Sequence, residues 1–218
     1  MGTPIEGSLE YWANKKPDEP AIIEENGFQL TWDEWNRRSN SLAEALVRRG
    51  IKPKDIVAVR SHIRHEWFVV NRALSKLGCS TLTINWRLTP AEVKYMIEDS
   101  GAKALILDDD DPISFMEEMK DTKLNFYATI GVNHQDPRLE RYEDFIEIEN
   151  PPERFFDGTR TSRIVYTSGT TGKSKGVYLP ISLQQEREKE IMEYMHDMER
   201  VKAVPFENST LLTLPLHH

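Results

Sequence analysis

Apolar and polar residues follow two alternating patterns along the first half of the chain. Short apolar runs, which are typical of buried strands, occur at DIVAVR (55–60), STLTI (80–84) and KALILD (103–108). Longer segments of mixed polarity predict helices that turn one apolar face to a core, at 31–49, 65–77 and 89–100. Strands and helices that alternate at this spacing predict an α/β fold, in which helices flank a mostly parallel sheet.

The expected helix ends carry their own signals. Thr31 with Glu34, and Thr89 with Glu92, have the spacing of capping boxes, in which each side chain binds the other residue's backbone N–H. Pro90 follows Thr89 at the first helical position, where its missing N–H costs nothing. Glycines suited to left-handed helix ends follow the three segments at Gly50, Gly78 and Gly101.

The other segments give weaker or more local signals. Asn26-Gly27 separates two short apolar runs and predicts a hairpin turn. The strand–helix pattern weakens between about residues 108 and 160. Beyond that region, residues 182–203 predict a long charged helix, and residues 209–218 predict a further strand.

Composition and charge narrow the class of protein. The 218-residue chain has 39% hydrophobic residues, which excludes a mostly disordered chain. Its net charge is -8, and this acidic balance argues against nucleic acid as the main partner. No apolar run approaches the roughly 18 residues of a membrane helix, and the acidic first residues lack a secretory signal, so we expect a cytoplasmic protein. The single cysteine, Cys79, excludes a disulfide within the chain. The aspartates at 108–111 could suggest a cation site, but such a run favours a solvated strand end.

The segment IVYTSGTTGKSKGV, residues 164–177, carries the candidate chemistry. Its hydroxyl groups offer O–H donors, its glycines allow backbone N–H groups to approach an anion closely, and its lysines add positive charge. The candidate phosphate-binding residues are Thr167, Ser168, Gly169, Thr170, Thr171, Gly172, Lys173, Ser174 and Lys175. From these residues alone, a solvent-exposed turn without a ligand is an equal alternative.

The glycine spacing separates this segment from the phosphate loop of ATPases. That loop has the pattern G-x-x-x-x-G-K-[ST], and Gly172-Lys173-Ser174 supplies its second half. The first glycine would stand at position 167, where this chain has Thr167. The spacing therefore argues against a nucleoside triphosphatase of the phosphate-loop class.

The whole stretch from Ile164 to Gly176 resembles the signature of the adenylate-forming, or AMP-binding, superfamily, apolar-x-x-[ST]-[ST]-G-[ST]-T-G-x-x-K-G. That superfamily contains acyl-CoA synthetases, peptide-synthetase adenylation domains and luciferases. NWRLTP (85–90) resembles the acyl-CoA synthetase branch, and LPLHH (214–218) is similar to a segment that follows the glycine loop in the family. Two positions depart from the family: Ser174 stands where proline is usual, and Pro180-Ile181 where a Ser/Thr-His pair is common.

The resemblance implies an enzyme that uses ATP and Mg²⁺ to convert a carboxylic acid substrate into an acyl-adenylate, which is then transferred to CoA. It implies catalytic roles for Thr170, Lys175 and His218. Residues 167–175 would bind the ATP phosphates, Thr170 would also lie at the metal, and His218 would lie near the carboxylate and acyl tunnel. An adenylating enzyme with a carrier-protein acceptor, and a non-catalytic module of the same fold, stay open as alternatives.

The resemblance also bears on the extent of the chain, because family members are more than twice as long. We therefore expect residues 1–218 to be the N-terminal part of the AMP-binding domain, within the large N-terminal domain of such an enzyme. The segments that bind adenine and ribose would then lie outside this chain. We expect the chain alone to be inactive, and to self-associate through apolar surface at its truncated edge.

Overall fold

The structure is a computed structural model that describes residues 4, 7–132, 134–154, 162–167, 173–180 and 186. Within these residues, the helices are α1 (Leu9–Lys15), α2 (Trp32–Arg48), α3 (His65–Leu77), α4 (Pro90–Ser100), α5 (Pro112–Glu118) and α6 (Tyr142–Ile146). The strands are β1 (Pro20–Ile23), β2 (Gln29–Thr31), β3 (Ile56–Arg60), β4 (Ser80–Ile84), β5 (Ala104–Leu107), β6 (Phe126–Thr129), β7 (Leu139–Arg141), β8 (Ser162–Thr167) and β9 (Lys175–Pro180).

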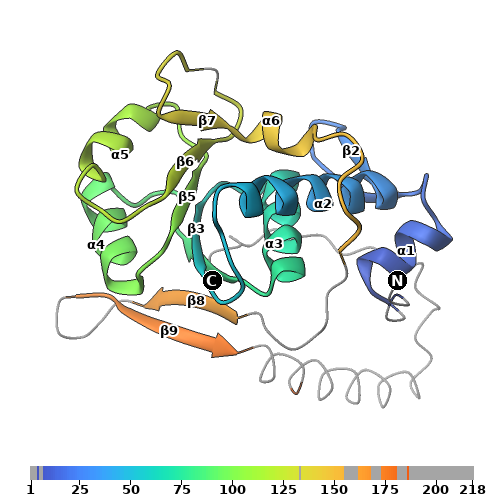
Figure 1. Cartoon of the computed structure of the whole chain (residues 1–218), viewed down its shortest axis with the longest axis horizontal. Coiled ribbons are helices and arrows are strands. Elements are labelled where there is room, and N and C mark those ends of the chain that lie inside the picture. Colours follow the sequence, from blue (N-terminus) through green and yellow to red (C-terminus); the bar gives the residue numbers. More distant parts are fainter. Residues whose placement is uncertain are drawn as a thin grey trace.

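A seven-stranded sheet forms the centre of the molecule, with the strand order β7-β6-β5-β3-β4-β8-β9. Neighbouring strands from β7 to β8 all pair in parallel, whereas β8 and β9 pair antiparallel. Helices lie on both sides of this sheet (Figure 1), as a buried parallel sheet requires. The predicted α/β fold with a mostly parallel sheet is confirmed.

Two apolar cores cover the opposite faces of the sheet. One core packs α2, α3 and α6 against β3, β5 and β6, and the other packs α4 and α5 against β3, β4, β5 and β8. Strand β3 contributes to both, because successive side chains of a strand point to opposite faces. Val57 and Val59 lie in the first core and Ala58 lies in the second.

The helix ends form as the sequence predicts. The Thr31 hydroxyl accepts a hydrogen bond from the Glu34 backbone N–H at 3.2 Å, and the Glu34 carboxylate accepts one from the Thr31 N–H at 3.0 Å. Thr89 and Glu92 make the same reciprocal pair at the start of α4. Positive φ angles follow the three helices at Gly50 (83°), Gly78 (67°) and Gly101 (70°).

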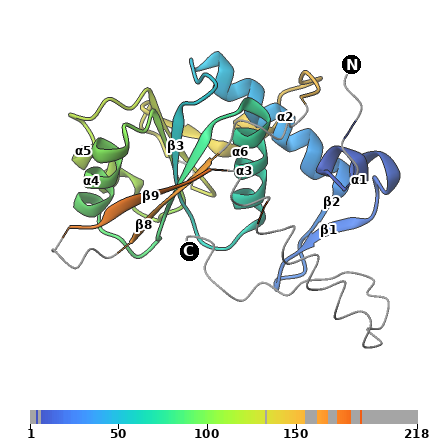
Figure 2. The ribbon, with the colours of Figure 1, turned by 90° about the horizontal axis from the view of Figure 1, so that it is seen from below.

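The N-terminal elements pack beside α2, away from α4 and α5 (Figure 2). Strands β1 and β2 form the predicted hairpin around Gly27, whose φ is +88°. A buried ammonium group joins α1, α2 and α3, because Lys76 Nζ lies 2.9 Å from Glu10 Oε1 and donates hydrogen bonds to Asn36 and Asn40. Burial lowers the pKa of Lys76, and the attraction of Glu10 opposes that shift.

The region after β5 contains structure that the sequence pattern did not predict. It forms α5, β6, β7 and α6, which are all seven residues long or shorter. Elements this short show too few turns or alternations for a period to stand out. The helix predicted at 182–203 and the strand predicted at 209–218 fall almost wholly outside the described residues. None of the helices that the structure describes has the length and apolar character needed to cross a membrane.

Candidate functional site

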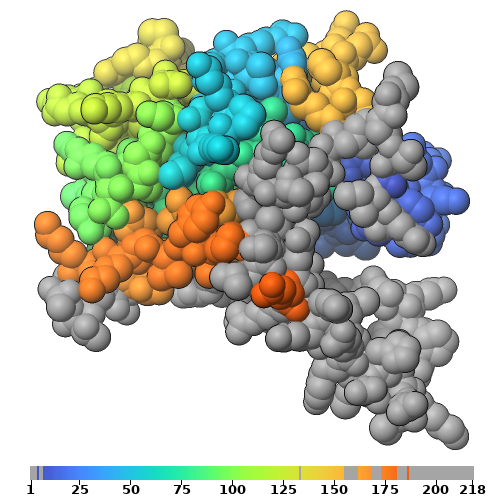
Figure 3. All heavy atoms as spheres, turned by 60° about the horizontal axis from the view of Figure 1, so that its bottom comes forward, coloured from blue at the N-terminus to red at the C-terminus, as the bar shows by residue number. Residues whose placement is uncertain are grey.

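The glycine-rich segment connects two antiparallel strands, β8 and β9. Thr167 at the end of β8 pairs with Lys175 at the start of β9, and Tyr166 pairs with Gly176. The two ends of the segment are therefore held side by side at the carboxyl edge of the parallel strands, the edge at which ligands bind in open α/β sheets. Figure 3 shows β8 and β9 (orange) at the molecular surface, beside the green part of the chain that contains α4.

The returning arm of the segment contacts helix α4. The Tyr95 hydroxyl donates a hydrogen bond to the Ser174 backbone carbonyl at 3.0 Å. The Lys173 ammonium lies over the Tyr95 ring, 5.6 Å from its centroid. Lys175 is exposed, and no ion pair with it occurs among the described residues. An exposed ammonium without a carboxylate partner is suited to bind an anion.

The outgoing arm is attached to the same helix. The Tyr166 hydroxyl donates a hydrogen bond to Asp99 Oδ2 at 2.5 Å. Burial raises the pKa of Tyr166, and its bond to Asp99 adds to that shift. The Tyr166 ring also explains the glycine opposite, because a Cβ atom at Gly176 would lie only 3.1 Å from the ring.

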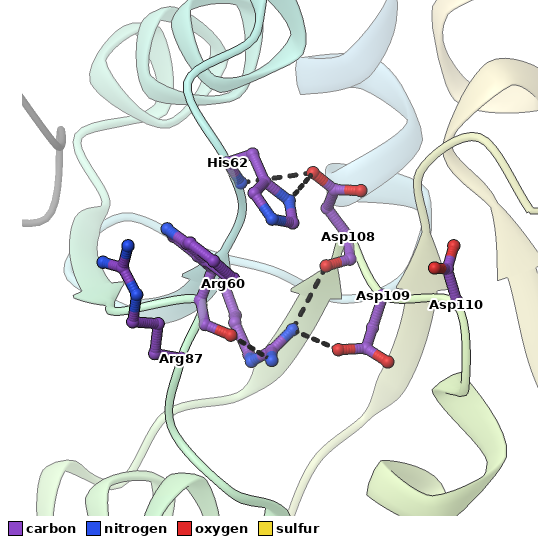
Figure 4. A pocket seen from close by; sticks show the side chains of 7 residues that line it. Arg60, His62, Arg87, Asp108, Asp109 and Asp110 are labelled. Atoms are coloured by element: carbon purple, nitrogen blue, oxygen red, sulfur yellow. Dashed lines mark hydrogen bonds and ion pairs between the residues drawn. The ribbon is translucent and has the colours of Figure 1, made fainter. Parts of the chain in front are cut away.

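A second feature of the carboxyl edge is a pocket of about 500 Å³. Its walls come from the ends of β3, β4 and β5, as Figure 4 shows. The pocket is lined by Arg60, His62, Trp86, Arg87, Asp108, Asp109 and Asp110. Two side chains lie against the Trp86 ring there. The Arg87 guanidinium lies 4.3 Å from the ring centroid of Trp86, and the ring centroids of His62 and Trp86 are 4.4 Å apart.

Several residues that line this pocket bind one another. The Arg60 guanidinium binds Asp109 Oδ2 at 2.7 Å, and Asp108 Oδ2 lies 2.9 Å from His62 Nδ1. Burial lowers the pKa of Arg60, while Asp109 opposes that shift. The interpretation of residues 108–111 as a solvated strand end is therefore wrong for Asp108, which is buried, whereas Asp109 is partly exposed and paired with a buried arginine.

Among the described residues, Glu24, His65 and Glu66 have ligand atoms close enough to hold a metal ion. These atoms already bind one another and a neighbouring arginine. His65 Nδ1 lies 2.9 Å from Glu24 Oε1, and the Arg64 guanidinium donates to both oxygens of Glu66. Because the carboxylates are satisfied by these partners, we assign the cluster to a hydrogen-bond network and not to a metal site.

Residues 9–218 match the family model described as AMP-binding enzyme. The chain belongs to the AMP-binding enzyme family. A fatty acid–[acyl-carrier-protein] ligase of Streptomyces coeruleorubidus is 30% identical over 173 residues, which cover 79% of this chain and 32% of the relative. A 2-succinylbenzoate–CoA ligase of Listeria innocua is 31% identical over 173 residues, which cover 78% of this chain and 33% of the relative. The predicted membership of the adenylate-forming superfamily is thus confirmed.

Solved structures of AMP-binding enzymes share the fold. The anthranilate CoA ligase AuaEII, solved in complex with anthranoyl-AMP, has a TM-score of 0.67 and 22% identity, with 79% of this chain and 34% of that chain covered. The chain spans about a third of the length of the curated relatives that it matches.

The structure describes only some of the residues of the predicted phosphate-binding site. It brings Thr167 and Lys175 together across the hairpin and places Lys173 and Ser174 against α4. Residues 168–172, which include Thr170, lie outside the described residues, as does His218. Their proposed roles at the phosphates, the metal and the carboxylate stay predictions.

Sequence reasoning missed the pocket and the support that α4 gives to the hairpin. A signal for the pocket was present, since Arg60 and Asp108 each end or follow a predicted strand, and parallel strands bring such ends to one edge. The support from α4 had no comparable signal. Tyr95 lies 79 residues before Ser174, and no local pattern links the two.

Proposed function

We propose that this chain is the N-terminal, phosphate-binding part of an ATP-dependent acyl-CoA synthetase. The full-length enzyme would activate a carboxylic acid as an acyl-adenylate and then transfer the acyl group to CoA. The observation that carries the proposal is the β8–β9 hairpin, which sets Thr167 beside Lys175 within the family's glycine-rich signature. Membership of the AMP-binding enzyme family supports the same chemistry.

The residues of the hairpin fit the charge that builds up when pyrophosphate leaves ATP. Hydroxyl and ammonium donors fixed in advance stabilise a developing anion better than water does, because they need no reorganisation. We assign this role to Thr167 and Lys175, with Lys173 adding positive charge on the same arm. The hydroxyls of the adjoining segment would complete the phosphate site, and Thr170 would lie at the Mg²⁺ ion that accompanies ATP.

CoA is the acceptor that we favour, and a carrier protein is the second candidate. The NWRLTP segment, residues 85–90, supports CoA through its likeness to the acyl-CoA synthetase branch. The relatives include both kinds of enzyme, one a CoA ligase and one an acyl-carrier-protein ligase. The acceptor is therefore tested directly in the experiment below.

We also propose that the 218-residue chain does not complete the reaction alone. Its relatives are about two and a half times as long, and substrate positioning accounts for roughly 7–11 kcal/mol of a reaction barrier. Val177 and Tyr178 on β9 are exposed, and exposed apolar side chains favour contact with a second molecule. We expect self-association of the isolated chain, which the molar mass in solution measures.

The proposal is tested with the full-length protein that contains this chain. We expect AMP release that requires ATP, Mg²⁺ and a carboxylic acid, and that increases when CoA is added. A phosphopantetheine-bearing carrier protein in place of CoA provides the comparison. Acceleration by the carrier protein alone would support the second candidate, and AMP release that is independent of any carboxylic acid would contradict both.

A further inference from the structure

We propose that Tyr95 on α4 is a positioning residue for the phosphate-binding hairpin. It holds the returning arm at Lys173 and Ser174, so that Lys175 enters β9 with its ammonium directed to the phosphates. This inference rests on the proposed function and assigns a role to a residue outside the glycine-rich signature. The following contacts carry it.

Tyr95 makes two different contacts with two successive residues of the arm. Its hydroxyl donates to the Ser174 carbonyl at 3.0 Å, which fixes the peptide plane immediately before Lys175. Its ring lies beneath the Lys173 ammonium at 5.6 Å from the centroid, within the range of a cation–π interaction. One side chain therefore restrains the backbone and orients a charge at the same place.

The same helix holds the other arm of the hairpin. Tyr166, the residue before Thr167, donates its hydroxyl hydrogen to Asp99, one helical turn after Tyr95. The rings of Tyr95 and Tyr166 meet edge to face, with centroids 6.3 Å apart and planes at 80°. Both ends of the glycine-rich segment thus rest on a single face of α4.

Helix α4 is a rigid support for this purpose. A complete capping box with Pro90 fixes its first turn, and a left-handed Gly101 follows its last turn. Val93, Met96 and Ile97 are buried in the core between α4 and the sheet. A contact with this helix therefore ties the hairpin to an element that is anchored in the core, whereas β9 has four exposed residues in succession.

Ser174 explains why the restraint is needed at this position. A proline would fix the backbone angle φ by itself, and the related signature usually has proline there, but serine leaves that angle free. The hydrogen bond from Tyr95 removes part of this freedom from outside. Because Lys175 is the next residue, a variable backbone conformation at Ser174 would also make the position of the lysine variable.

The test compares two tyrosines that make the same kind of bond. Tyr95→Phe removes the bond to the Ser174 carbonyl and keeps the ring under Lys173. Tyr127→Phe, on β6, is the matched control. The Tyr127 hydroxyl likewise donates a hydrogen bond to a backbone carbonyl, that of Met119, at 3.1 Å. Steady-state KM values for ATP and for the carboxylic acid are measured separately in the full-length protein.

We expect Tyr95→Phe to raise the KM for ATP by about three- to tenfold, the equivalent of one ordinary hydrogen bond. The KM for the carboxylic acid should stay within about twofold, and Tyr127→Phe should change neither constant, because its bond is remote from the hairpin. An unchanged KM for ATP in Tyr95→Phe, or an equal rise in both KM values, would overturn the inference.

Hydrogen exchange of the chain gives a second readout that does not depend on activity. The backbone amides of residues 173–176 should exchange faster in Tyr95→Phe and at the wild-type rate in Tyr127→Phe. Equal exchange in the two variants would overturn the inference even in an active enzyme. A wild-type protein without carboxylate-dependent activity would instead refute the proposed function, and the exchange result would then decide the role of Tyr95 alone.

Discussion

The two central strands β4 and β5 differ sharply from the outer strand β9. Every residue of β4 and β5 is buried, whereas the first four residues of β9 are exposed. The central strands are covered by helices on both faces and supply the apolar burial that stabilises the fold. The hairpin at the edge supplies little burial, yet it presents the lysines and hydroxyls of the candidate site.

This difference separates the residues that determine stability from those that determine activity. Active-site groups need exposure to their ligand, so they gain little rigidity from burial. In this chain, backbone pairing with β4 holds β8, backbone pairing with β8 holds β9, and polar contacts of Tyr95 and Tyr166 with α4 add to this support. Substitutions in the two regions should therefore change different measurements.

The largest effect is expected at Lys175, which is exposed on β9. In the full-length protein, Lys175→Ala should slow acyl-adenylate formation by about 10²- to 10³-fold, since it removes a charge-assisted donor to the leaving group. Carboxylic acid binding should be nearly unchanged, and so should the melting temperature. Lys123→Ala, at another exposed lysine, is the control. Isotope exchange between pyrophosphate and ATP at the wild-type rate would contradict the assigned role.

The next effect contrasts the same substitution in the two regions. Val57→Ala removes two methyl groups from the middle of β3, where the side chain is fully buried. It should lower the free energy of unfolding by about 2–3 kcal/mol, from lost transfer free energy and the cavity left behind. Val177→Ala on β9, where the side chain is 40% exposed, should cost less than about 0.5 kcal/mol. Urea unfolding of both variants measures the contrast, and similar losses would remove the distinction between the regions.

A smaller, pH-dependent effect comes from the buried Cys79. Burial raises the pKa of this thiol from 9.0 to about 12, and the charge of Asp55 adds to that shift. The folded state therefore keeps its proton at pH values where the unfolded state has lost it. The free energy of unfolding should fall as the pH rises above about 9, by on the order of 1 kcal/mol per pH unit. Cys79→Ala should flatten this slope, and an unchanged slope would show that other groups cause it.

The smallest effect tests whether backbone freedom at Ser174 is what Tyr95 restrains. Ser174→Pro should leave the wild-type KM for ATP within about twofold, because proline fixes the angle that Tyr95 already holds. Combined with Tyr95→Phe, the same substitution should recover about half of the lost affinity for ATP. A double variant no better than Tyr95→Phe would show that Tyr95 does not act through the backbone at this position.

Sequence patterns predicted the parts of the molecule that depend on local physics. The capping boxes at Thr31 and Thr89, the glycine helix ends and the buried strands are all specified by residues within one turn or one strand. The glycine-rich signature likewise located the candidate site between β8 and β9. These features were readable because each depends on residues that are neighbours in the sequence.

Contacts between distant residues could not be read in the same way. Asp108 and Asp109 were expected to be solvated, because their pairing with His62 and Arg60 depends on how β3 and β5 align. The support of Ser174 by Tyr95 depends in addition on the position of α4 beside β8. In both cases the partner lies more than 40 residues away.

The central claim, that the hairpin serves adenylate formation, is tested most directly by the products made from ATP. The full-length protein is incubated with ATP, Mg²⁺ and a panel of carboxylic acids, without CoA, and the nucleotides and phosphates are separated. The account predicts AMP and pyrophosphate in amounts that depend on the carboxylic acid, with both reduced in Lys175→Ala. ADP and inorganic phosphate formed without any carboxylic acid would contradict it, because they would identify the hairpin as part of a simple ATPase site.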